Sequence, residues 1–142
     1  MSVLVIDASI VVKWFIPEVH SAEARHLLES SDQYVAPDLL FAEVANTIWK
    51  KVMRGELSGD DAQRLVNDIE SIAVTTVPCR ELAADAHALA LATGRTVYDA
   101  MYLALAIRLK TRLLTADKRL ANAVASIAMI AKHVQLIAAS TS

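Results

Sequence analysis

Cysteine is almost absent from this chain: Cys79 is the only one among 142 residues. A single thiol excludes a disulfide framework and a cysteine-rich zinc site, and it fits a reducing cytoplasm. A basic excess is absent as well, because the formal net charge is −2. No global basic field therefore indicates a nucleic-acid partner, although bound divalent cations can supply positive charge locally.

A long uninterrupted apolar run is also missing. The apolar N-terminal stretch carries Asp7 and Lys13 and has no basic leader region, which argues against a signal peptide. The most apolar late stretch, residues 120–139, is interrupted by Lys132 and His133. Because a membrane-spanning helix needs about 18 consecutive apolar residues, we expect a cytoplasmic protein with no membrane association.

Hydrophobic residues, in contrast, are abundant and make up 55% of the chain. The length suits one domain, and no repeat, linker or low-complexity segment is visible. We expect a single domain over residues 1–139, followed by a disordered tail at 140–142. The apolar excess has two explanations: a surface buried in an oligomer, which we favour, or a parallel sheet buried on both faces.

Short β-branched runs alternate with helical patterns along the sequence. The runs predict strands at residues 3–6, 34–36, 74–77, 113–115 and 134–137. The helical patterns predict helices ending near Phe15 and over 21–30, 39–54, 58–72, 78–94 and 96–109, with a last one opened by Asp117. Asp38 is expected to cap the helix that starts at residue 39. This alternation predicts an α/β fold with helices on both faces of a parallel sheet.

Two acids stand at the carboxyl ends of predicted strands, where ligands bind in open parallel sheets. Asp7 directly follows the run Val-Leu-Val-Ile, and Asp117 follows Leu-Leu-Thr by two residues. Each can also be explained as a cap of the helix that comes next. If the first and fourth strands are neighbours, the two carboxylates meet at the point where the strand order reverses.

Two further acids lie on predicted helices. Asp99 is the only charge in the segment 96–107, and a helix that is apolar on nearly all sides is buried. A buried carboxylate is costly unless it is paired or bound to metal, although an acid in the first helical turn also suits the helix dipole. Glu43 borders the apolar face of its helix, with a surface salt bridge to Lys50 as the alternative explanation.

Together the four acids indicate a carboxylate cluster without histidine or cysteine ligands. The four histidines are scattered without metal-ligand spacing. Oxygen-only ligation suits hard cations such as Mg²⁺ or Mn²⁺. Crowding would raise the carboxylate pKa values by mutual repulsion, so we expect an Asp99→Asn chain to lose activity and to gain stability without metal.

Four segments resemble, in order and spacing, the successive motifs of PIN-domain ribonucleases of the VapC toxin type: Val5-Ile-Asp-Ala-Ser9, Phe41-Ala-Glu-Val-Ala-Asn46, Val97-Tyr-Asp-Ala-Met-Tyr-Leu-Ala-Leu-Ala106 and Leu113-Leu-Thr-Ala-Asp117. The resemblance covers nearly the whole chain, and the third and fourth motifs together are specific. Ala8 and Leu120 depart from it, since relatives often have a hydroxyl and an aromatic residue there. Neither departure removes a carboxylate.

The resemblance implies a set of roles for residues of this chain. The metal-site acids of the family, which carry catalysis with one or two Mg²⁺ or Mn²⁺ ions, fall on Asp7, Glu43, Asp99 and Asp117. The hydroxyl and amide groups that support those acids fall on Ser9, Asn46 and Thr115. The basic residues beside the first and fourth motifs, which we expect to contact RNA phosphates, are Lys13, Lys118 and Arg119.

The resemblance further implies a PIN-like three-layer α/β/α sandwich with about five parallel strands. It implies an endoribonuclease toxin that cleaves RNA, often transfer or ribosomal RNA, and that is neutralised by a VapB-type antitoxin. A homodimer is also implied. The alternative is a PIN-like module that binds RNA or protein without cutting it, but all four acids are present.

Two other folds that gather acids on a parallel sheet are disfavoured by specific positions. A phosphorylation receiver domain needs an aspartate after the third strand, where this chain has Val77-Pro78-Cys79. A phosphatase of the haloacid dehalogenase type needs a second aspartate two residues after Asp7, where Ser9 stands. For both enzyme classes, this chain lacks a residue that their chemistry requires.

Overall fold

The computed structural model describes residues 2–137, and its strands form one five-stranded sheet with the order β3-β2-β1-β4-β5. All neighbouring strands are parallel. Their bounds are β1 Val3–Ile6, β2 Gln33–Pro37, β3 Val74–Val77, β4 Leu113–Thr115 and β5 Val134–Leu136. The expected parallel sheet of about five strands is confirmed, and β1 and β4 are neighbours.

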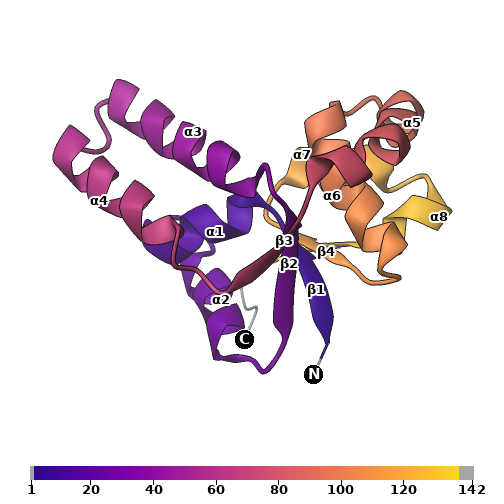
Figure 1. Ribbon diagram of the computed structural model, residues 1–142, viewed down its shortest axis with the longest axis horizontal. Coiled ribbons are helices and arrows are strands. Elements are labelled where there is room, and N and C mark those ends of the chain that lie inside the picture. The colour runs from indigo at the N-terminus through magenta and orange to yellow at the C-terminus, as the bar shows by residue number, and fades with distance from the viewer. Residues whose placement is uncertain (1, 138–142) are drawn as a thin grey trace.

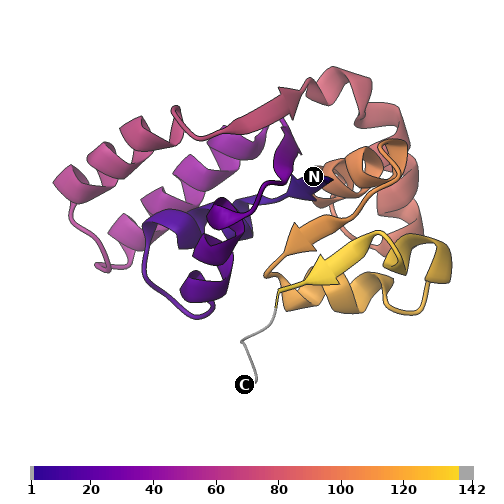
Figure 2. The ribbon, with the colours of Figure 1, turned by 90° about the horizontal axis from the view of Figure 1, so that it is seen from below.

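Helices cover both faces of this sheet. Those from the first half of the chain are α1 Ala8–Phe15, α2 Ser21–His26, α3 Leu40–Met53 and α4 Gly59–Ile69, and those from the second half are α5 Ala83–Thr93, α6 Val97–Arg108, α7 Lys118–Val124 and α8 Ala128–Ala131. Figures 1 and 2 show the first four on one side of the strands and the last four on the other. The strands β1, β2 and β3 follow one another in one direction across the sheet, and β4 and β5 lie on the other side of β1. Because each crossover is right-handed, the helices of the two halves lie on opposite faces.

Local details differ from expectation at several helix ends. Asp38 does not cap α3: its Oδ1 accepts from the Cys79 backbone N–H at 3.0 Å, and Leu39 occupies the cap position. The helix expected over 78–94 begins as a short 3₁₀ turn at Cys79–Glu81, and the one over 21–30 ends as another at Leu27–Glu29. The last helix is split into α7 and α8.

One continuous core lies between the sheet and its helices. Val5 and Ile6 of β1 and Leu103 and Leu105 of α6 have no exposed surface. The helix α6 packs on β1, β2 and β4, as its nearly all-apolar sequence predicts. Among residues 2–137 no helix is long and apolar enough to cross a membrane. The expected tail at 140–142 and the domain end at 139 lie outside the described residues.

Candidate active site

The four predicted acids line one small cavity of about 140 Å³ at the carboxyl edge of the sheet. Asp7 follows β1, Asp117 lies two residues beyond β4, and Glu43 and Asp99 lie in the first turns of α3 and α6. The remaining lining residues are Ala8, Ser9, Tyr102 and Leu120. Segments up to 110 residues apart in sequence therefore meet at the point where the sheet order reverses, as the strand-end positions predict.

Asp7 is both a helix cap and a buried charge. Its Oδ1 accepts from the backbone N–H of Ser9 at 3.0 Å and of Ile10 at 3.4 Å, which caps α1. The residue is only 8% exposed, and burial raises the pKa of its carboxyl from 3.8 to about 6. The hydrogen bonds oppose this rise, and the charge of Asp117 adds to it. Asp7 therefore caps α1, but capping alone does not explain why its carboxyl is buried, because a helix cap can be exposed to solvent.

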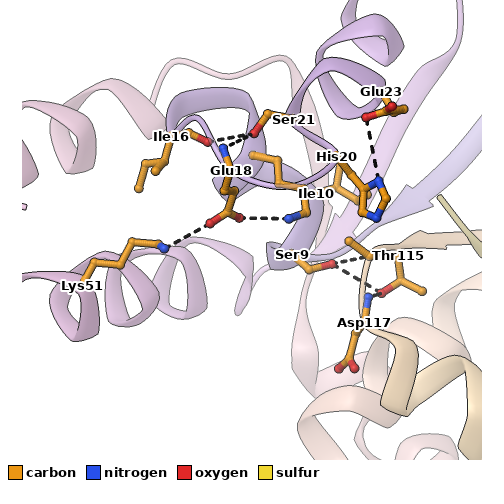
Figure 3. Close-up of polar contacts among 12 residues, drawn as sticks. Ser9, Ile10, Ile16, Glu18, His20, Ser21, Glu23, Lys51, Thr115 and Asp117 are labelled. Carbon is orange, nitrogen blue, oxygen red and sulfur yellow. Dashed lines mark hydrogen bonds and ion pairs between the residues drawn. The ribbon is translucent and has the colours of Figure 1, made fainter. Parts of the chain in front are cut away.

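Two hydroxyls hold the Asp7 carboxylate in place. Ser9 Oγ donates to Oδ1 and Thr115 Oγ1 donates to Oδ2, each at 2.5 Å. Each hydroxyl also accepts from the backbone, Ser9 from Ala116 at 2.9 Å and Thr115 from Asp117 at 3.0 Å. Figure 3 shows Ser9 pointing from α1 towards Thr115, beside Asp117. The hydroxyls thus connect the end of β1 to the start of α7.

Replacing Thr115 with valine is expected to lower the free energy of unfolding by about 1–3 kcal/mol. Valine keeps the shape, but it leaves Asp7 Oδ2 and the Asp117 N–H without their buried partner. Chemical denaturation without metal measures the change, with Thr76→Val on the exposed part of β3 as the matched control. Equal stability of the two variants would show that the Thr115 hydroxyl does not hold the acid.

Glu43 is oriented by a residue that the sequence reasoning did not single out. Tyr102 Oη donates to Glu43 Oε1 at 2.6 Å, so the expected alternative partner Lys50 is not the one found. Burial raises the pKa of Glu43, the Tyr102 hydrogen bond opposes this, and the Asp99 charge adds to it. Burial also raises the pKa of Tyr102, which keeps its hydroxyl a donor. The signal available in the sequence was the three-residue spacing from Asp99 to Tyr102 on one helix face.

Asp99 and Asp117 face each other across Arg95, which the sequence reasoning also missed. Arg95 Nη2 lies 2.8 Å from Asp99 Oδ2 and 3.6 Å from Asp117 Oδ2. Asp117 uses its other oxygen, Oδ1, to cap α7 through the N–H groups of Arg119 and Leu120. Because Arg95 neutralises Asp99, the stability gain expected for Asp99→Asn loses its basis, and we transfer that expectation to Asp7. The four-residue spacing from Arg95 to Asp99 was the available signal.

The donor set of the cavity fits a hard divalent cation, because every charged group lining it is a carboxylate. The present contacts, however, satisfy these acids with protein donors: hydroxyls for Asp7, a phenol for Glu43, and a guanidinium for Asp99 and Asp117. Within residues 2–137, no group of three or more histidines, cysteines and acids is placed to hold one metal ion. A cation that binds the Oδ2 atoms of Asp99 and Asp117 would have to exchange partners with Arg95.

A second, cationic cavity of about 540 Å³ adjoins the acid cavity and shares Asp117 with it. Its charged and titratable lining residues are Lys13, His20, Arg95, Asp117, Lys118 and Arg119. Three of these are the predicted phosphate contacts, although Lys13 also pairs with Glu18 at 3.1 Å. Asn46, in contrast, is exposed on α3 and does not line either cavity.

His20 occupies the N-cap position of α2. Its backbone lies in the left-handed region, with φ 66°, which is unusual for a residue with a side chain. Strained backbone of this kind concentrates at functional sites. Figure 3 shows its ring beside Glu23, with Nδ1 4.0 Å from the Glu23 carboxylate. No sequence pattern indicated this position, because the conformation depends on the turn that joins α1 to α2.

The sequence as a whole matches the family model of the PIN domain over residues 4–125. The chain belongs to the PIN-domain family. A relative from Pyrobaculum aerophilum named Ribonuclease VapC3 is 38% identical over 121 residues, which cover 84% of this chain and 92% of the relative. The resemblance inferred from the four motifs is thereby confirmed.

Solved structures agree with this assignment at the level of the fold. VapC20 from Mycobacterium tuberculosis, described as a sarcin-ricin loop cleaving toxin, superposes with a TM-score of 0.67 and 12% identity over 84% of this chain and 94% of that one. VapBC2 from Rickettsia felis, solved with a promoter DNA fragment, superposes with a TM-score of 0.61 and 12% identity over 96% and 99%. The expected PIN-like α/β/α sandwich is confirmed.

Proposed function

We propose that this chain is a Mg²⁺- or Mn²⁺-dependent endoribonuclease of the VapC toxin type, which hydrolyses phosphodiester bonds in RNA. The observation that carries the proposal is the meeting of four carboxylates from separate segments in one small cavity at the sheet edge. Relatives named as VapC ribonucleases, such as the one from Pyrobaculum aerophilum, support it. We retain transfer or ribosomal RNA as the expected substrate class.

In this proposal Asp7, Asp99 and Asp117 hold the cation, one or two ions in number. A divalent cation bound there would supply positive charge to a scissile phosphate and lower the pKa of a water. Glu43, whose pKa is raised by burial, either joins the ligands or accepts a proton from the attacking water. Ser9 and Thr115 hold Asp7, and Tyr102 holds Glu43, so that each carboxylate keeps its orientation.

The cationic cavity is the proposed path of the RNA backbone. Lys118 and Arg119 are exposed beside Asp117, and Lys13 lies in the same lining. Positive side chains there would contact phosphates on one side of the scissile bond. We further propose a cytoplasmic homodimer that is neutralised by a VapB-type antitoxin. The similarity of this fold to a chain of the VapBC2 structure from Rickettsia felis supports that last point.

The experiment that tests the function uses the purified chain, free of antitoxin, and total cellular RNA. New 5′ ends are sequenced after incubation with Mg²⁺, with Mn²⁺ or with chelator. We expect discrete cuts that need the metal and disappear with chelator, which would identify the activity and its substrate together. No cuts with either metal, with the fold intact by circular dichroism, would move the assignment to a PIN-like module that binds without cleaving.

A further inference from the structure

One arginine side chain lies within ion-pair distance of two of the four acids in the cavity. Arg95 donates to Asp99 Oδ2 from Nη2 at 2.8 Å and from Nε at 3.1 Å, and the same Nη2 lies 3.6 Å from Asp117 Oδ2. All three side chains are partly exposed, between 25% and 35%. The guanidinium therefore lies between two carboxylates that we propose as metal ligands.

The backbone around Arg95 does not favour a positive charge at this place. Gly94 ends α5 in the left-handed conformation, with φ 75°, which turns the chain so that Arg95 comes directly before Thr96, the N-cap of α6. The N-terminus of a helix carries partial positive charge and repels a cation. The two carboxylates therefore account for the position of the guanidinium, and their loss to another cation would leave it without a stabilising partner.

Space for a displaced guanidinium is available next to the acid cavity. Arg95 already lines the cationic cavity of about 540 Å³, which also contacts Asp117. The Arg95 side chain has several rotatable bonds, and rotation about them is the route by which its guanidinium would move further into that cavity. There it would lie beside Lys118 and Arg119, where we place the RNA backbone, so the new position suits a phosphate.

We propose that Arg95 is an internal counter-ion that competes with divalent cations for Asp99 and Asp117, and that a bound cation displaces its guanidinium into the cationic cavity. The inference rests on the proposed metal-dependent function and deepens it. The position of Arg95 explains two observations together. Four acids line one cavity, yet among the described residues no three metal-binding side chains are placed to hold one ion. Arg95 then sets how much metal the protein needs, and it couples metal binding to the charge of the RNA path.

The test is the affinity for Mn²⁺ without RNA, measured by isothermal titration calorimetry on the full chain. We expect Arg95→Gln to bind Mn²⁺ about tenfold more tightly than the unchanged chain, which corresponds to about 1.4 kcal/mol. The matched control is Arg54→Gln, at the far end of α3, which removes the same charge from an exposed position. Its affinity is expected to stay within about twofold, since exposed charges at that distance are screened.

A second readout follows the side chain itself. The Nε–H resonance of Arg95, assigned by its loss in Arg95→Gln, is expected to shift when Mg²⁺ is added to the unchanged chain. Equal or weaker Mn²⁺ affinity of Arg95→Gln, or an Arg95 resonance that stays fixed at saturating Mg²⁺, would overturn the proposal while leaving a metal-dependent ribonuclease intact. If neither chain binds Mn²⁺, both the inference and the proposed metal dependence fail.

Discussion

A chain with Asp99→Asn is expected to cleave RNA about 10³-fold more slowly than the unchanged chain, a loss of about 4 kcal/mol in transition-state stabilisation. Asparagine keeps the size of the side chain but removes a negative charge and one anionic ligand from the cavity. A cation held by fewer charges binds more weakly and neutralises the phosphate less well. The rate of appearance of the mapped RNA ends, with saturating Mn²⁺, measures the change.

The control for this loss is Asp68→Asn on α4. Asp68 is an exposed helical aspartate far from the acid cavity, and its replacement is expected to leave cleavage unchanged. Cuts that persist at the full rate in Asp99→Asn would show that a contaminating nuclease produced them. Equal losses in both variants would point to a general effect of the substitutions on folding rather than to the cavity.

Replacing Asp7 with asparagine is expected to stabilise the metal-free protein by about 1–3 kcal/mol at neutral pH. Burial raises the pKa of this carboxyl from 3.8 to about 6, so the folded chain holds a proton that the unfolded chain releases. Between these two pH values the stability of the unchanged chain falls as pH rises, and above about pH 6 the loss is complete. The full difference corresponds to about 3 kcal/mol, and the charge lost from the cap of α1 offsets part of it.

Urea denaturation in chelator at about pH 4 and about pH 8 tests this prediction. We expect Asp7→Asn to remove the fall in stability that this acid causes, so that the variant exceeds the unchanged chain only at the higher pH. With saturating Mn²⁺ we expect the unchanged chain to become more stable than Asp7→Asn. A bound ion stabilises the folded state, and the variant binds the ion more weakly because it has lost a carboxylate. A variant that is less stable than the unchanged chain at both pH values would contradict the cost assigned to burying this charge.

Much of the site could be predicted because its acids are marked by local patterns. A carboxylate directly after a buried β-branched run, such as Asp7, must lie at a strand end. The isolated acid in an apolar helix, Asp99, also lines the cavity, although its side chain is 27% exposed and is not buried as its apolar neighbours predicted. Both positions follow from neighbours within a few residues, and the resemblance to the PIN-domain motifs added the same residues independently.

For two acids, the partner that the local sequence suggested is not the partner found in the structure. Asp38 has the residue type and the place of a helix cap, yet it accepts from Cys79 at the end of β3, which sheet pairing brings near it. For Glu43 the alternative was a surface salt bridge to Lys50, about two helical turns along α3, yet Glu43 accepts from Tyr102 of α6. In both cases a contact made by packing replaced a local one, which propensity and spacing cannot foresee.

The sequence by itself determined the order of the elements, the parallel sheet and the four acids, since each depends on periodicity and on residues close in the chain. Only the tertiary structure decided what those acids contact: hydroxyls for Asp7, Tyr102 for Glu43, and Arg95 between Asp99 and Asp117. The physical reason is that most of these contacts join residues far apart in the chain, and which of several nearby donors a carboxylate takes is set by packing and side-chain rotamers.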